Sequence, residues 1–244
     1  MFDLSIYDHV QAQLGPDDKT ALLTVFAAVR RHLGTYTYLE IGSWQGGSLQ
    51  PIVADPACVR AYSFDARKGG PKYEKWNASR MRANLARVPG ADLEKLHCFD
   101  RAFAGDEIGA LAWDAVDVSF IDGWHTPEMA WRDFEALRAR AEDEPLPVIL
   151  WHDVDMIATA FKRAHKALPG SVAYRLSDKV GMIYAGDWAA FATPELLALC
   201  KPMRWGRATV WWAIRRRWRR FTPEALRAVL APMATWLKHK VAGL

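Results

Sequence analysis

Short apolar runs alternate with helical stretches from about residue 17 to residue 184, and this alternation limits most strongly what the chain can fold into. Strands that alternate with helices favour a mostly parallel sheet with helices on both faces. The seven predicted strands are 35–41, 59–64, 93–99, 115–121, 148–151, 171–176 and 180–184. Only residues 177–179 separate the last two strands, so we expect these two to form an antiparallel hairpin.

The tripeptide Thr-Pro-Glu occurs three times, beginning at Thr126, Thr193 and Thr222. A threonine cap, a proline at the first helical position and an acid in the first turn are typical of a helix start. The sequence therefore predicts helices that begin directly after these three threonines. The first of these helices follows a predicted strand closely.

A glycine-rich turn follows the first predicted strand, in the stretch Tyr-Leu-Glu-Ile-Gly-Ser-Trp-Gln-Gly-Gly-Ser at 38–48. In open α/β sheets this position is the ligand crevice. The acid before the glycines suits a cationic amino acid group and would repel the pyrophosphate of a dinucleotide. We predict a Rossmann-like α/β domain whose ligand contacts include Glu40, Gly42, Ser43, Trp44, Gly46, Gly47 and Ser48.

Acidic residues also follow the next two strands. Asp65 ends the second strand, where its carboxylate suits the two hydroxyls of a ribose. Asp100, with Arg101 beside it, follows the third strand and is a candidate for contact with an adenine amino group. Structural interpretations stay open: the glycines would also serve a tight turn, and Asp65 would also cap a helix.

Two further strands end in residues that carry chemistry. The segment 116–125 reads Val-Asp-Val-Ser-Phe-Ile-Asp-Gly-Trp-His and contains Asp122 and His125, and 148–153 ends in His152 and Asp153. Because parallel strands end at the same edge of a sheet, we expect these side chains to share the crevice of the glycine turn. The alternatives are structural: a turn cap for Asp122, a helix-start residue for His125, and a sheet-edge hydrogen bond for His152 and Asp153.

Taken together, these motifs resemble methyltransferase family 24 of the class I S-adenosylmethionine (SAM) dependent methyltransferases, akin to the macrocin and rhamnosyl O-methyltransferases. The matching residues are 40–46, 120–125, Asp133 and 152–153, within a resemblance that covers about 35–185. The resemblance implies a SAM-dependent O-methyltransferase whose acceptor is a hydroxyl of a sugar, a glycan or another polar small molecule. From its helical position we interpret Asp133 as structural.

The resemblance also implies roles at the reacting end of the site. Asp122 would contact the cofactor and, with His152 and Asp153, hold Mg²⁺ or Mn²⁺, while His125 would be the general base. A bound cation would lower the pKa of the acceptor hydroxyl, and an imidazole with a pKa of about 6.5 can take the proton. The family has an acidic pair where this chain has 152–153, and magnesium prefers oxygen to the imidazole of His152. Without SAM, the same residues would suit a metal-dependent hydrolase or hydroxylase.

The net charge of +4 is distributed unevenly along the chain. From residue 201 on there are eleven Lys and Arg against the single acid Glu224, whereas residues 1–200 carry 21 basic and 27 acidic residues. Five of the 12 tryptophans also lie beyond residue 201. We therefore predict two parts, a SAM-dependent methyltransferase domain at 1–190 and a basic, Trp-rich helical C-terminal extension at 191–244.

An apolar stripe marks one predicted helix of this extension, at Trp211, Ile214, Trp218 and Phe221. It would pack on the acidic body or on a second subunit of a homo-oligomer, or it would make peripheral membrane contact through 201–240. Nucleic acid binding is disfavoured, because no RNA-binding module accompanies the basic residues. A non-catalytic module that binds membrane or nucleic acid through this extension is the rival outside enzymes.

Cysteine usage and the apolar runs bear on the compartment. Cys58, Cys98 and Cys200 are odd in number and far apart, so they indicate neither a disulfide framework nor a thiolate metal site. The first ten residues lack the pattern of a signal peptide, and no apolar run has the roughly 18 residues of a spanning helix. We expect a cytoplasmic protein, peripheral to the inner face of the membrane if the extension binds lipid.

Overall fold

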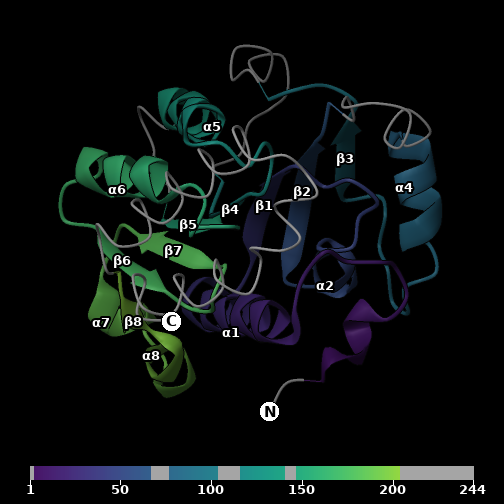
Figure 1. The fold of residues 1–244 in the computed structure, drawn as a ribbon. Helices are drawn as coiled ribbons and strands as arrows, with labels where there is room; N and C mark the ends of the chain where they lie inside the picture. Colours follow the sequence, from purple (N-terminus) through teal and green to yellow (C-terminus); the bar gives the residue numbers. More distant parts are fainter. Residues whose placement is uncertain (1–2, 67–76, 104–115, 141–146, 204–244) are drawn as a thin grey trace, which may run out of the picture.

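The computed structural model describes residues 3–66, 77–103, 116–140 and 147–203, and within these ranges the strands form one sheet (Figure 1). The strand order is β3-β2-β1-β4-β5-β7-β6-β8. Strands β1 to β5 pair in parallel, and β7 runs antiparallel between β5 and β6. The strands are β1 (Tyr36–Ile41), β2 (Cys58–Phe64), β3 (Leu96–Phe99), β4 (Val118–Ile121), β5 (Val148–Trp151), β6 (Val172–Arg175), β7 (Gly181–Tyr184) and β8 (Lys201–Pro202).

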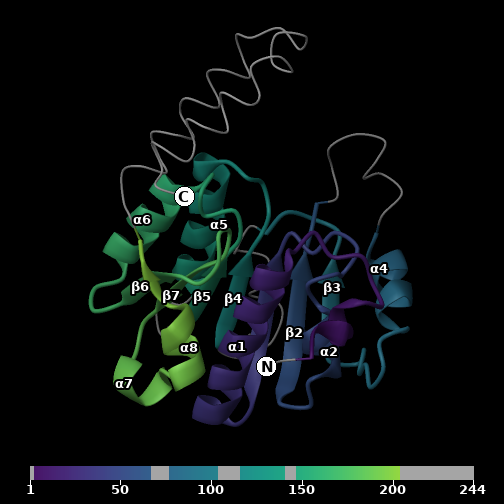
Figure 2. The same ribbon diagram turned by 60° about the horizontal axis from the view of Figure 1, so that its bottom comes forward.

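Helices cover both faces of this sheet, with α1 and α8 on one side and α5 and α6 on the other (Figure 2). A short 3-10 helix, η1, comes before α1 in the chain. The helices are η1 (Leu4–Tyr7), α1 (Pro16–Leu33), α2 (Gln50–Ala54), α4 (Ala78–Leu85), α5 (Pro127–Arg140), α6 (Ala158–Ala167), α7 (Trp188–Phe191) and α8 (Pro194–Leu199). No helix in the described ranges is long and apolar enough to cross a bilayer.

Two apolar cores lie on the two faces of the sheet, because successive strand residues point to opposite sides. In β1, Tyr36 and Tyr38 pack with the helix α1, whereas Leu39 and Ile41 pack with α5 and α6. All six residues of β1 are buried, which is expected of a central parallel strand covered on both faces. Strand β1 is therefore fixed from both sides, and so is the turn that follows it.

The predicted fold class is confirmed, including the antiparallel hairpin of β6 and β7. Strand 148–151 has the predicted bounds, and the other predicted strands differ by up to three residues at their starts. The prediction of seven strands missed β8, which pairs with β6. A strand of two residues carries no alternating pattern, so β8 could not be predicted from the sequence.

Two of the three predicted helix starts are confirmed. The hydroxyl of Thr126 accepts a hydrogen bond from Met129 N at 3.3 Å, and that of Thr193 accepts one from Leu196 N at 3.1 Å. Thr222 lies outside the described residues, as does the part of the predicted extension beyond residue 203. Helix α7 spans residue 190 and α8 follows it, and both contact α1. The domain boundary at residue 190 stays a prediction.

The turn after β1 approaches the end of β4 so closely that it requires glycine. Gly42 has φ +97°, and a Cβ atom built on it would lie 2.1 Å from the carbonyl oxygen of Asp122. The Gly42 N–H donates to Phe64 O at 2.8 Å, and Asp122 N donates to Ile41 O at 2.8 Å. Backbone bonds thus hold the ends of three neighbouring strands together at this glycine.

We expect Gly42→Ala to lower the free energy of unfolding by about 3 kcal/mol or more, because backbone strain and overlap with Asp122 add. Gly90→Ala is the matched control: Gly90 also has positive φ, +74°, but has nothing within 4 Å of its built Cβ. Gly90→Ala should lower the free energy of unfolding by only about 1 kcal/mol. Urea denaturation measures both losses, and equal values would contradict the close approach at Gly42.

Glu40 is fully buried in β1, one residue before the strand ends. Its two carboxylate oxygens accept hydrogen bonds from Tyr38 Oη at 2.7 Å and from Ser48 Oγ at 2.6 Å. Burial raises the pKa of Glu40 from 4.5 to about 7, although these two hydrogen bonds oppose the shift. The predicted ligand acid is therefore an internal residue, which reaches the glycine turn through Ser48.

A pH dependence follows from Glu40. Between its unfolded pKa of 4.5 and its folded pKa of about 7, the folded state holds a proton that the unfolded state has lost. Stability should therefore fall as the pH rises through this window. In Glu40→Gln this contribution is absent, so the free energy of unfolding should fall less between about pH 5 and about pH 8 than in the wild type. Chemical denaturation at both pH values tests this, and parallel losses would contradict it.

Candidate active site

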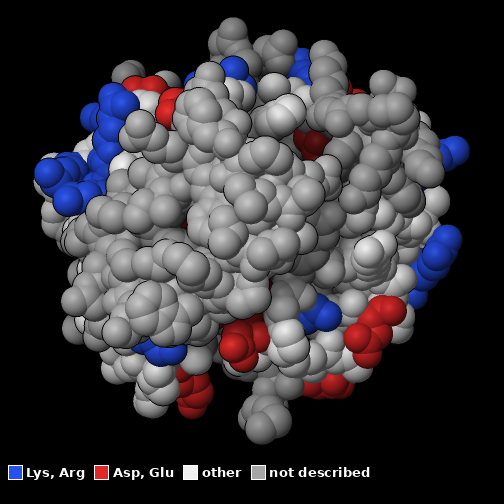
Figure 3. Space-filling view, in the orientation of Figure 1, with Lys and Arg blue, Asp and Glu red and all other residues white. Residues whose placement is uncertain are grey.

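A pocket of about 370 Å³ opens where β1, β2, β4 and β5 end, and we call it the strand-end pocket. Its position and size are those of a small-molecule site in an open α/β sheet. It is lined by residues 11–14, 41–44, 47–48, 64–66, 102, 122–125, 132–133, 152–153 and 179. In Figure 3, charged side chains of both signs lie around the rim of the face in view.

One side of the pocket is built by the glycine turn and the end of β2. Gly42, Ser43, Trp44, Gly47 and Ser48 line it, as does Asp65. The Asp65 carboxylate accepts a hydrogen bond from Trp44 N at 2.5 Å. Trp44 has φ +43°, a conformation that costs a non-glycine residue energy and that this hydrogen bond helps to hold. The turn and Asp65 thus fix each other, and both were predicted for this site.

Four predicted cofactor residues do not line the strand-end pocket: Glu40, Gly46, Asp100 and Arg101. A Cβ on Gly46 would meet Met81 Cγ at 2.9 Å, so this glycine permits packing against α4. Asp100 accepts a hydrogen bond from Ala78 N at 2.8 Å, at the start of the same helix. The cofactor contacts of these four residues stay predictions.

The N-terminal segment forms a wall of the pocket that the sequence did not indicate. Residues 11–14 line the pocket, and the buried amide of Gln50 holds the chain just before them. Gln50 Oε1 accepts from Val10 N at 2.7 Å, and Gln50 Nε2 donates to Gly47 O at 2.8 Å. A Cβ on Gly47 would lie 2.3 Å from Gln11 O, so the segment lies directly on the glycine turn. The sequence around Gln50 has no repeating pattern, so the contact of this segment with the glycine turn could not be predicted from it.

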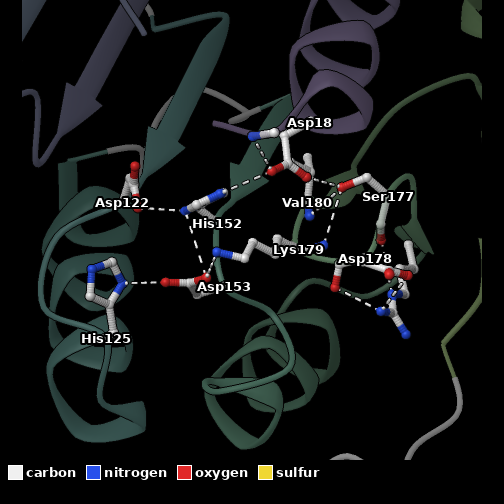
Figure 4. Close-up of polar contacts among 11 residues, drawn as sticks. Asp18, Asp122, His125, His152, Asp153, Ser177, Asp178, Lys179 and Val180 are labelled. Atoms are coloured by element: carbon white, nitrogen blue, oxygen red, sulfur yellow. Dashed lines mark hydrogen bonds and ion pairs between the residues drawn. The ribbon is translucent and has the colours of Figure 1, made fainter. Parts of the chain in front are cut away.

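The reacting end of the pocket brings together the four residues predicted for it, as Figure 4 shows. Asp122 follows β4, His125 comes just before α5, and His152 and Asp153 follow β5. His125 Nδ1 lies 2.9 Å from Asp153 Oδ2, and His152 Nδ1 lies 3.0 Å from Asp122 Oδ1. Asp153 has φ +50°, a conformation that Asp and Asn tolerate better than other side chains do.

Two residues that the sequence did not indicate complete this cluster. Asp18 in the first turn of α1 has Oδ2 3.6 Å from His152 Nε2, an ion-pair distance longer than a hydrogen bond. Lys179, in the loop between β6 and β7, has Nζ 3.3 Å from Asp153 Oδ1. In the sequence Asp18 is one more first-turn acid and Lys179 a hairpin residue, so only the folded chain relates them to the site.

The charges of the cluster depend on one another. Burial favours the neutral ring of His152, but Asp122, Asp18 and Asp153 outweigh it and raise its pKa to about 10. The hydrogen bond that His125 donates to Asp153 raises the pKa of His125 above 6.5, against the effect of burial. Burial opposes the charge of Asp153, but His125, His152 and Lys179 hold its pKa well below 3.8. The arrangement therefore contains a protonated His152 and an ionised Asp153 at neutral pH.

A further part of the pocket wall carries Trp124 and Asp133. The Trp124 side chain is 55% exposed, although it lies beside His125 in the lining. Asp133, on α5, is buried, and this burial raises its pKa to about 6 while Arg132 opposes the shift. The sequence indicated only a structural role for Asp133, and the structure adds that this residue lines the pocket.

The predicted metal ligands do not fit a divalent cation in this arrangement. Among the described residues, no group of three His, Cys, Asp or Glu has a geometry that could hold one. Both oxygens of Asp153 face nitrogen atoms, and His152 lies between Asp18 and Asp122. A metal ligand must be deprotonated and open to the metal. The arrangement therefore does not support the predicted metal binding by Asp122, His152 and Asp153.

Comparisons with known proteins agree with the fold. Residues 39–154 match a family model described as a methyltransferase domain. No curated protein matches the chain. An O-methyltransferase from Bacillus cereus, solved in complex with S-adenosylhomocysteine (SAH), is 14% identical, with 76% of this chain and 92% of that chain covered and a TM-score of 0.51.

A second solved structure is a TDP-rhamnose 3'-O-methyltransferase of calicheamicin biosynthesis, which is 15% identical. The comparison covers 71% of this chain and 82% of that chain, with a TM-score of 0.49. At 14% identity the likeness to the Bacillus cereus enzyme shows a common fold alone. Residues 39–154 match the methyltransferase domain model, and the chain is an enzyme of the class I SAM-dependent methyltransferase type.

Proposed function

We propose that this enzyme transfers the methyl group of SAM to a hydroxyl of a sugar, a glycan or another polar small molecule. The observation that carries the proposal is the pair of His125 and Asp153, 2.9 Å apart, in the same pocket as Gly42 and Asp65. Methyl transfer to a hydroxyl requires a general base and a binding site for the methyl donor in the same cavity.

The donor side of the pocket fits SAM. A Cβ on Gly42 would fill the space against Asp122, so bare backbone lines this part of the pocket. Asp65 offers a carboxylate for ribose hydroxyls, and Ser48 a hydroxyl bound to buried Glu40. When bound, SAM supplies a methyl group on a positively charged sulfur. The carboxylates of this pocket would favour that charge.

His125 has the geometry of a general base. Its Nδ1 faces Asp153, so in the neutral ring this nitrogen carries the proton and Nε2 can accept one from a hydroxyl. Asp153 keeps the ring oriented and favours the imidazolium that forms, as a carboxylate does beside a catalytic histidine. The acceptor hydroxyl would lose its proton to Nε2 as its oxygen takes the methyl group.

The acceptor class is supported by the part of the pocket wall that carries Trp124 and Asp133. Trp124 presents a large exposed aromatic surface beside His125, against which the apolar face of a sugar ring can lie. Arg132 and Asp133 lie in the same wall and can bond hydroxyls or an anionic group. A panel of free sugars, sugar nucleotides and catechols, offered with radiolabelled SAM, tests the class. Label transfer to catechols alone would contradict a sugar acceptor.

The remaining predictions concern partners and compartment. The peripheral membrane contact of 201–240, the homo-oligomer and the cytoplasmic location stay predictions, because the structure describes nothing beyond residue 203. Divalent metal assistance is not part of the proposed mechanism, since the predicted ligands are engaged with other side chains.

We expect wild-type protein freed of bound ligand to bind SAH, and Asp65→Asn to bind it about 10-fold to 100-fold more weakly. The substitution keeps an oxygen acceptor for Trp44 N while it removes the charge that faces the ribose. Asp92→Asn, at an exposed residue outside the pocket, is the control and should bind as the wild type does. Isothermal titration calorimetry measures the three affinities. No heat with the wild type would contradict the proposed function.

The pair of His125 and Asp153 predicts a shifted titration. Because the Asp153 hydrogen bond raises the pKa of His125, the ring should titrate above pH 6.5, and Asp153→Asn should lower that pKa. Asparagine tolerates the positive φ of this position. NMR titration of the histidine ring protons, with the His125 signal assigned by its loss in His125→Gln, measures the shift. The titration of His97, which lies outside the pocket, should be the same in both proteins. An unchanged His125 pKa in Asp153→Asn would contradict the hydrogen bond between His125 and Asp153.

A further inference from the structure

The reacting end of the strand-end pocket contains as many basic as acidic side chains. Its carboxylates belong to Asp18, Asp122 and Asp153, and its basic groups belong to His125, His152 and Lys179. Every one of these carboxylates has a nitrogen of a basic group within 3.6 Å. The cluster therefore carries its own counter-charges, all supplied by the chain.

The space between the two carboxylates at the strand ends is already filled. His152 Nδ1 lies 3.0 Å from Asp122 Oδ1 and 3.9 Å from Asp153 Oδ1, so the edge of the imidazole is between them. Lys179 Nζ faces Asp153 Oδ1 at 3.3 Å, while His125 faces Oδ2 at 2.9 Å. In Figure 4 the Lys179 side chain extends toward Asp153 from the loop that joins β6 and β7.

A divalent cation would have to displace these groups. Magnesium needs oxygen ligands at about 2.0–2.1 Å in near-octahedral geometry. Asp153 would first have to release Lys179, and the His152 ring would have to leave the gap. Otherwise the ion would meet the Lys179 ammonium at short range, where like charges repel strongly. The electrostatics of the cluster oppose metal binding.

The loop that carries Lys179 is anchored at the same strand end. Val154 N donates a hydrogen bond to Lys179 O at 2.9 Å, and Ser177 Oγ donates one to Asp18 Oδ1 at 2.5 Å. Asp18 and Ser177 are both buried. The ammonium group is thus held near Asp153 by its own backbone and by its neighbours in the loop.

We propose that the reacting end works without a divalent cation, and that Lys179 is a positioning residue that supplies the charge holding Asp153 against His125. The inference rests on the proposed function, in which Asp153 orients the base. It predicts that removing the ammonium leaves Asp153 short of a counter-charge, so that a divalent cation can enter beside it.

Binding of Mn²⁺ alone tests the proposal without any acceptor. Full-length wild-type protein, titrated with Mn²⁺ and followed by the electron paramagnetic resonance signal of the free ion, should show no site tighter than about 1 mM. Lys179→Met, which keeps the length of the side chain without its charge, should bind one Mn²⁺ at least about tenfold more tightly than the wild type. The double variant Lys179→Met, Asp153→Asn should lose that site.

Two further variants separate charge from structure. Lys179→Arg keeps the cation and should bind no Mn²⁺, and Lys166→Met removes an exposed lysine of α6 outside the pocket and should behave as the wild type. One Mn²⁺ bound by the wild type and lost in Asp153→Asn would overturn the proposal. Failure of Lys179→Met to gain Mn²⁺ binding would overturn the role of Lys179.

An SAH titration of the wild type in the presence of a chelator keeps the two proposals distinguishable. Unchanged SAH affinity in chelator, together with the Mn²⁺ results above, supports a centre that needs no metal. SAH binding that requires added Mn²⁺ or Mg²⁺ would overturn it while leaving the methyltransferase function intact. No SAH binding under any condition would contradict the proposed function and would not depend on the charge of Lys179.

Discussion

The ion pairs of His152 are the interaction on which the reacting end depends. This buried imidazole lies between Asp18 of α1 and Asp122 at the end of β4, and thereby ties a helix from the start of the chain to the centre of the sheet. Removing one partner of a buried ion pair costs several kcal/mol, because the remaining charge stays buried and uncompensated. The positions of Asp122 and Asp153 at the pocket therefore depend on a protonated His152.

The second constraint is the close approach of the glycine turn to β4. Gly42 brings the end of β1 against the backbone of Asp122, so the donor side and the reacting end of the pocket share one contact. The N-terminal segment then closes over the same turn through Gln50 and Gly47. Parts distant in the sequence form one cavity because the parallel strands all end at this edge.

Patterns that depend on local chemistry were predictable from the sequence. The strand at 148–151 and the helix starts at Thr126 and Thr193 are confirmed, because a continuous apolar run and helix capping act within a few residues. The convergence of Asp122 with His152 was also predictable, because topology alone brings the ends of parallel strands together.

Contacts between distant segments were not predictable. Asp18 and Lys179 reach the site only through the packing of α1 and the β6–β7 loop, which no spacing in the sequence records. Glu40 was expected to face the ligand, but both of its oxygens accept hydrogen bonds inside the protein. A strand pattern shows that a residue is buried, whereas its partners depend on side chains elsewhere.

The most direct test of the whole account is a crystal structure of the complex with SAH. The account predicts the ribose hydroxyls at Asp65, the adjoining backbone at Gly42, and the sulfur directed toward the side of the pocket that holds His125. SAH bound away from the ends of β1 and β2, or with its sulfur turned from His125, would contradict it.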